Sequence, residues 1–232
     1  MDNSIEFVSD IFNIIDEEWP KSRVRFSLFV VANALCPVLA RAKTMPEVGV
    51  RMVYLAMRLL DINTVDASQI TKPETYATYF GNTISTLTSL ASQILEGEER
   101  KIVLKRCVEI ILDIQEWFVS KGVICRDDII TASFHSTLVL DILDDSELEK
   151  VTNKIIALNR IAVQNTKKYD YEVAMMASPF IEVLIYAWKK LGNEKYLKLA
   201  RETFDIAHTA WIKYNFHEKA ENFKKKYGEV WR

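Results

Sequence analysis

The sequence predicts an all-α protein with no sheet. Glycine and proline are scarce, with 6 and 5 among 232 residues, whereas sheet-rich chains use both residues at frequent turns. Apolar residues make up 49% of the chain and recur mostly at steps of three and four, which is the period of an amphipathic helix. The segments between the periodic stretches are short. We therefore expect about ten helices joined by brief connections.

The first helix is expected over residues 1–20, as a cap on the N-terminal end of the domain. Its apolar residues step by three or four and so share one face: Ile5, Val8, Phe12, Ile15 and Trp19. Pro20 ends this helix, because its ring fixes the backbone and it has no N–H to donate.

Two further helices are expected before residue 63, over residues 22–43 and 44–62. The second begins at a capping box, in which the Thr44 hydroxyl accepts from the backbone N–H of Glu47 and the Glu47 carboxylate reaches back. The connection that follows, residues 63–70, is longer than the others and is expected to be mobile.

Two long helices are expected in the middle of the chain, over about residues 72–96 and 97–121. A Thr-x-Pro-Glu sequence opens the first of them, and Gly81-Asn82 is expected to interrupt it. Gly122 follows the second helix and is typical of the residue after a helix end, where the backbone turns left-handed.

Five helices are expected in the C-terminal part. They cover residues 127–143, a segment that begins with a capping box at Ser146–Glu149, and residues 171–191, 194–214 and 217–227. The helix over residues 171–191 is apolar on nearly all sides and is therefore expected at the centre of the fold. Gly192-Asn193 is typical of a turn between helices.

Short connections force neighbouring helices to run antiparallel, so we expect stacked antiparallel helical hairpins in a single domain over residues 1–232. Four hairpins are expected: 22–62, 72–121, 127–168 and 171–214. The helix over residues 1–20 and a basic, aromatic segment over residues 217–232 cap the two ends. A closed bundle and a short open α-solenoid both satisfy this pattern.

One of these hairpins resembles those of tetratricopeptide-type and α/α-toroid proteins. Residues 184–207 contain the Gly192-Asn193 turn, followed by Ala200, Phe204 and Ala207 at the spacing of small and aromatic packing residues. Any packed hairpin needs a small residue where its helices approach closely, so the similarity reflects shared packing and no family is recognised. A truncated α/α-toroid enzyme that acts on a carbohydrate is a less favoured interpretation.

The sequence argues against several classes of function. The net charge of −2 predicts no bulk attraction to nucleic acid or anionic lipid, and no apolar stretch reaches the roughly 20 residues that span a membrane. Cys36, Cys107 and Cys125 match neither a disulfide framework nor a zinc pattern, which is typical of a cytoplasmic protein. The sequence has no Gly-rich phosphate loop and no H-E-x-x-H motif. We therefore expect no metal and no cofactor.

Arg201 and His208 are the candidate catalytic residues. Seven residues on a helix turn through nearly two circles, so the two side chains share one face. Arginine binds phosphate and histidine moves a proton, and the pair resembles the motif of the HEPN class of helical ribonucleases. The resemblance implies metal-independent RNA cleavage, although Glu202 would repel a phosphate. In the alternative interpretation, Arg201 pairs with Asp205 and His208 flanks the core.

Aromatic and basic residues near the C-terminus are candidate binding residues. They combine rings suited to a groove with a run of lysines: Trp188, Trp211, Tyr214, Lys224, Lys225, Lys226 and Tyr227. Core packing of the rings and a solvated helix end for the lysines are the favoured alternative interpretations. His135 is expected to be a hydrogen-bonded helix residue, and Asp144-Asp145 to cap a helix.

We interpret the chain as a non-enzymatic helical-hairpin protein that binds another protein, a peptide or a second copy of itself. The interpretation follows from the long grooves that stacked hairpins present and from the lack of a complete catalytic set in the sequence. The ribonuclease alternative, with RNA as the substrate, depends on Arg201 and His208.

Overall fold

The computed structural model describes residues 10, 49–50, 53–54, 57, 61, 73–124, 126–164 and 171–230, and most of them are helical. It contains seven helices in this part of the chain and no strand: α5 (Pro73–Ile94), α6 (Gly97–Ser120), α7 (Arg126–Thr137), α8 (Asp145–Gln164), α9 (Tyr171–Leu191), α10 (Glu194–Lys213) and α11 (His217–Tyr227). The prediction of an all-α fold is confirmed. The expected number of about ten helices is not reached, because the helices predicted before residue 63 fall mostly outside the described residues.

The chain divides into two compact units, Met1–Val123 and Ile124–Arg232. In the first unit, α5 packs against α6 through fully buried leucine, isoleucine and phenylalanine side chains. The helix α5 runs without a break through Gly81-Asn82, so the predicted interruption there is wrong. A glycine inside a helix costs about 1 kcal/mol relative to alanine, which the apolar contact with a neighbouring helix can offset.

The end of α6 follows the prediction for Gly122. This residue has a φ of +76°, and its N–H donates to the Val119 carbonyl over 2.9 Å. The next N–H, of Val123, donates to the Phe118 carbonyl over 3.0 Å. These two bonds form a Schellman motif, which satisfies carbonyls that the helix end would otherwise leave without a donor.

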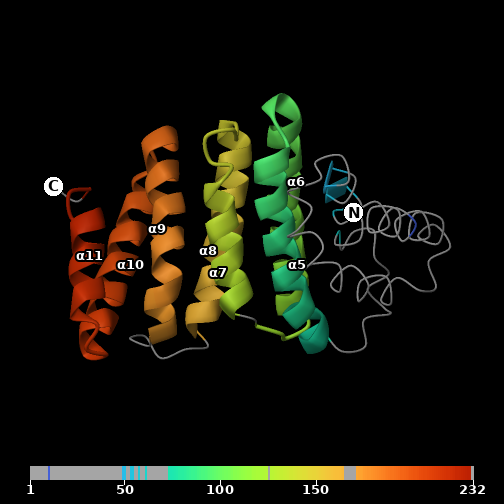
Figure 1. The fold of residues 1–232 in the computed structure, drawn as a ribbon. Helices are drawn as coiled ribbons and strands as arrows, with labels where there is room; N and C mark the ends of the chain where they lie inside the picture. The colour runs from blue at the N-terminus through green and yellow to red at the C-terminus, as the bar shows by residue number, and fades with distance from the viewer. Residues whose placement is uncertain are drawn as a thin grey trace. The chain divides into compact units, whose positions relative to one another are not determined.

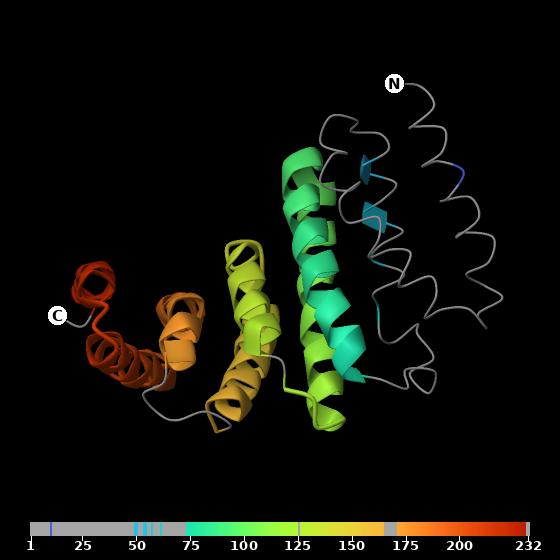
Figure 2. The same cartoon turned by 60° about the horizontal axis from the view of Figure 1, so that its bottom comes forward.

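In the second unit, α9 is the central helix. It packs against α7, α8 and α10, while α11 packs against α10. Figure 1 shows α7 to α11 side by side, and Figure 2 shows α9 between the α7–α8 pair and α10. The buried residues of α9 cover about half of its circumference, from Val183 on one side through Phe180 to Ala174 on the other, so it is able to contact neighbours on more than one side.

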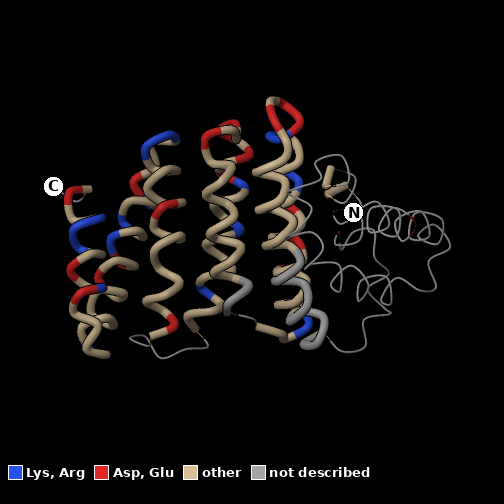
Figure 3. The backbone as a smooth tube through the Cα atoms, in the orientation of Figure 1, with Lys and Arg blue, Asp and Glu red and all other residues tan. Residues whose placement is uncertain are grey.

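The turn between α9 and α10 follows the sequence prediction. Gly192 takes a φ of +68°, which few residues other than glycine adopt without strain. The side chain of Asn193 then accepts a hydrogen bond from the backbone N–H of Lys195 over 3.1 Å and caps the start of α10. Figure 3 shows basic residues in the last turns of α9 and α11, where they face the negative ends of the helix dipoles.

The capping box of α8 lies two residues before its predicted place. Asp144 Oδ1 accepts from the backbone N–H of Glu147 over 2.8 Å, and Glu147 Oε2 accepts from the backbone N–H of Asp144 over 2.9 Å. The predicted box at Ser146–Glu149 is therefore wrong. Because α8 already begins at Asp145, Ser146 lies inside the first turn and Asp144 is the residue that precedes the helix.

We expect Asp144→Ala to lower the free energy of unfolding of the Ile124–Arg232 unit by about 1 kcal/mol, because a backbone N–H of α8 loses its acceptor. Urea denaturation followed by circular dichroism measures this change. Ser146→Ala is the matched control and should leave the free energy within about 0.5 kcal/mol of the wild type. Equal effects of the two substitutions would contradict the assignment of the cap.

None of the described helices is both long and apolar enough to cross a membrane.

Candidate functional site

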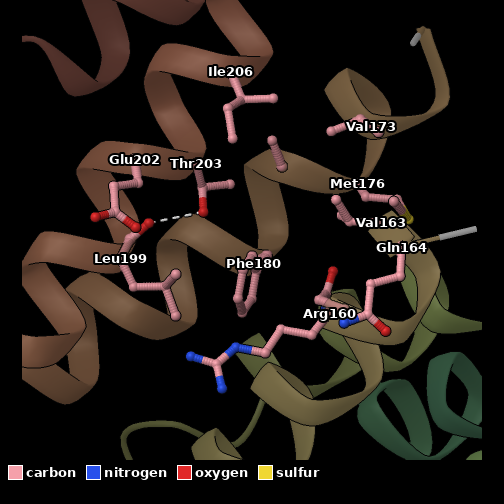
Figure 4. Close-up of a pocket in the computed structure, with 12 residues that line it drawn as sticks. Arg160, Val163, Gln164, Val173, Met176, Phe180, Leu199, Glu202, Thr203 and Ile206 are labelled. Atoms are coloured by element: carbon pink, nitrogen blue, oxygen red, sulfur yellow. Dashed lines mark hydrogen bonds between the residues drawn. The ribbon is translucent and has the colours of Figure 1, made fainter. Parts of the chain in front are cut away.

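A pocket of about 340 Å³ lies between α8, α9 and α10 in the second unit. Figure 4 shows the side chains from the three helices that converge on it. Most of its lining is apolar and is buried or half-buried: Val163, Val173, Met176, Ala177, Phe180, Leu199 and Ile206. Pockets of this size and character are typical of sites that bind an apolar group.

The mouth of the pocket carries charge of both signs. Arg160 and Gln164, from α8, and Glu202, from α10, line the pocket and are exposed. Within the part of the chain that the structure describes, neither Arg160 nor Glu202 makes an ion pair. Both charges are therefore available to a molecule that enters between α8 and α10.

The polar residue at the floor of the pocket is Asn159, which is only 3% exposed. Its amide nitrogen donates to Ser133 Oγ over 3.1 Å and to the Ile155 carbonyl over 2.9 Å. The first bond joins α8 to α7, and the second belongs to α8 itself. Both amide protons of Asn159 are thus used, and its Oδ1 makes no hydrogen bond to any described residue.

Thr203 carries the one hydroxyl among the residues that line the pocket. Its Oγ1 donates to the Leu199 carbonyl over 2.8 Å, the bond that is drawn as a dashed line in Figure 4. This bond lies within α10 and ties the side chain to its own helix. The hydroxyl proton of Thr203 is therefore not offered to a ligand.

The two candidate catalytic residues lie on α10 but do not line this pocket. Arg201 is exposed, whereas the His208 ring is half-buried and stacks on Phe204 with 5.7 Å between the ring centroids. Phe204 in turn stacks on Phe223 of α11 at 5.2 Å. His208 Nε2 is buried and has no hydrogen-bond partner among the described residues. The histidine therefore lies against the α10–α11 contact, and the ribonuclease alternative stays a prediction.

Two residues of α11, Lys226 and Tyr227, make polar contacts with α9. Tyr227 is 3% exposed, and its hydroxyl lies 2.7 Å from Ser178 Oγ and 3.1 Å from Glu182 Oε1. Lys226 makes an ion pair with the same Glu182 carboxylate. Burial is the main cause that raises the pKa of Tyr227, and the Glu182 charge raises it further. These two predicted binding residues thus make contacts within the chain.

The other candidate binding residues lie in three different places. Trp188 is half-buried and donates from Nε1 to Glu194 over 3.0 Å, and Lys224 and Lys225 are exposed on α11. Trp211 and Tyr214 join an aromatic cluster with Tyr171 and Phe216. The Lys219 ammonium lies 5.0 Å from the centroids of both Trp211 and Phe216, a cation–π contact that holds α11 against the end of α10.

His135 and Cys107, two titratable residues that the sequence analysis considered, are both buried. Burial lowers the pKa of His135 to about 4, so this residue is neutral at pH 7. Burial also raises the pKa of the Cys107 thiol to about 12, which keeps it protonated and unreactive.

Cys36, Cys125 and the 63–70 connection lie outside the described residues. Among the residues that the structure does describe, no three histidines, cysteines or carboxylates gather in a way that could hold a metal ion.

Sequence reasoning missed the pocket because its lining has the spacing of an ordinary core. On α9, for example, Val173, Met176 and Phe180 step by three and four, as buried core residues do. The one signal was Asn159, a polar residue beside the apolar stripe of α8 that includes Leu158 and Ala162. A buried amide in such a position needs partners, and one side of it faces the pocket.

The sequence matches no protein-family model, and a comparison with curated proteins finds no significant match.

Proposed function

We propose that the Ile124–Arg232 unit is a protein-binding module, built of stacked helical hairpins, whose pocket receives an apolar side chain of a partner segment. The observation that carries the proposal is the pocket between α8, α9 and α10, with its apolar lining and its volume of about 340 Å³. A concave apolar site with a few polar groups at its edge is typical of a binding site.

The charges at the mouth support a peptide rather than a purely apolar compound. Arg160 and Glu202 approach from different helices, so a segment that crosses the pocket passes a cation on the α8 side and an anion on the α10 side. A peptide can offer a charge of the matching sign to each of them. Such rim charges set the orientation and the association rate more than the affinity.

The test uses peptides, because no partner is specified. A random peptide library displayed on phage is selected against the full chain, and the enriched peptides are synthesised for titration. Thr203→Trp places a large side chain at the wall of the pocket, whereas Thr209→Trp places the same side chain at an exposed position of α10 that does not line it.

We expect Thr203→Trp to weaken the binding of the enriched peptides by about 10-fold to 100-fold, because a buried apolar side chain contributes about 1.5–3 kcal/mol. Thr209→Trp should leave the affinity unchanged, and circular dichroism should show both variants folded. Failure to enrich any peptide would contradict the proposal. So would enriched peptides that bind the wild type and Thr203→Trp equally well.

A further inference from the structure

The floor of the pocket offers a hydrogen-bond acceptor, the amide oxygen of Asn159. Asn159 is 3% exposed, and both of its amide protons are already donated, to Ser133 and to the Ile155 carbonyl. The Thr203 hydroxyl is donated to the Leu199 carbonyl. Asn159 Oδ1 is thus the polar atom of the floor that a ligand can satisfy, within the described part of the chain.

A ligand that displaces water from the pocket leaves Asn159 Oδ1 without a partner unless it brings one hydrogen-bond donor on an otherwise apolar body. An indole fits this requirement, because its N–H donates and it has no acceptor of its own. A phenol also carries an acceptor, and neither Asn159 nor Thr203 has a proton left to donate to it. An ammonium carries three donors and a charge, and its burial among apolar side chains is costly.

The walls of the pocket also suit an aromatic ring. Met176 and Phe180, both buried on α9, line the pocket together with Ile206 of α10. A methionine sulfur and a phenylalanine ring both make favourable contacts with an aromatic edge or face. Figure 4 shows the labelled Phe180 side chain near Leu199 and Thr203 of α10, and the labelled Met176 side chain near Val163 and Gln164 of α8.

We infer that the anchor of the partner segment is a tryptophan side chain, whose indole N–H donates to Asn159 Oδ1 while its rings lie against Met176 and Phe180. This inference rests on the function proposed above, because it names the residue that the pocket takes. Tryptophan is among the residues that carry most of the binding energy in protein interfaces when they fill a closed pocket.

The test compares free compounds of the same shape with the full chain. Indole carries the N–H, whereas 1-benzothiophene replaces it with sulfur and 1-methylindole replaces the proton with a methyl group. Titration followed by nuclear magnetic resonance of the protein amides gives the three dissociation constants. We expect indole to bind about 10-fold more tightly than either analogue, and we expect Thr203→Trp to abolish its binding while Thr209→Trp retains it.

Asn159→Leu provides a second measurement on the protein side. It removes the acceptor, so we expect it to bring the affinities for indole and 1-benzothiophene within about twofold of each other. This substitution also removes the bond to Ser133, and a variant that does not fold leaves the ligand series on the wild type as the deciding measurement.

Two outcomes separate this inference from the proposed function. Equal binding of indole and its analogues by the wild type would overturn the tryptophan anchor. Enriched peptides that lack tryptophan, yet lose affinity in Thr203→Trp, would also overturn the anchor while they support the pocket as a peptide site. Peptides that do not respond to Thr203→Trp would overturn both.

Discussion

Tyr227→Ala is expected to lower the free energy of unfolding of the Ile124–Arg232 unit by about 4 kcal/mol. The Tyr227 ring is buried, with its centroid 4.9 Å from that of Phe223 and 6.5 Å from that of Phe204 on α10. Its removal leaves a cavity in the contact that holds α11. The substitution also takes the hydroxyl away from Ser178 and Glu182, which are polar partners on α9.

Two measurements test this expectation. Urea denaturation followed by circular dichroism gives the change in the free energy of unfolding. Hydrogen exchange of the α11 amides, residues 217–227, shows whether the helix loses its protection, as it should when its main anchor is gone. A loss of less than about 1 kcal/mol would show that α11 does not depend on this residue.

Tyr227→Phe is the matched control, because it keeps the ring and removes only the hydroxyl. We expect it to cost about 1 kcal/mol, the usual contribution of one hydrogen bond. The difference between the two variants then measures the packing of the ring against α10. Equal losses in Tyr227→Ala and Tyr227→Phe would mean that the hydroxyl, rather than the ring, holds α11 in place.

The helices of the second unit could largely be predicted from the sequence, because each has an apolar stripe between clear start and stop signals. The predicted bounds 217–227 agree with α11, and Gly192-Asn193 separates α9 from α10 as expected. The start of α8 could not be placed as well. Asp144 and Ser146 are both good capping residues, and each has a glutamate three positions later, at Glu147 and Glu149.

The site could not be predicted in the same way, because it depends on how three helices pack. The same three-and-four spacing places Phe204 against α11 and Ile206 beside the pocket, so the pattern on α10 does not separate core from binding surface. Likewise, the sequence puts Arg201 and His208 on one helix but does not say what lies opposite them. The structure shows that the His208 ring stacks on Phe204, which in turn stacks on Phe223 of α11.

Because His135 is buried, we expect the free energy of unfolding to depend strongly on pH. This residue is 3% exposed on α7, and burial lowers its pKa from 6.5 to about 4. Between pH 6.5 and pH 4, the His135 imidazole therefore binds a proton in the unfolded chain but not in the folded chain. The contribution of His135 to the free energy of unfolding is fully present above pH 6.5 and is lost as the pH drops toward 4. The loss amounts to about 3 kcal/mol, since each pKa unit corresponds to about 1.4 kcal/mol.

Carboxylates also titrate in this range, so the test is a difference between variants. The free energy of unfolding is measured in urea at pH 7, 6, 5 and 4 for the wild type, His135→Gln and His217→Gln. His217 is exposed, and its variant should follow the wild-type profile. His135→Gln has no group to protonate at this position, and its profile should fall less steeply, by about 3 kcal/mol over the range. Parallel profiles for His135→Gln and the wild type would show that this imidazole accepts its proton as readily in the folded protein as in the unfolded chain.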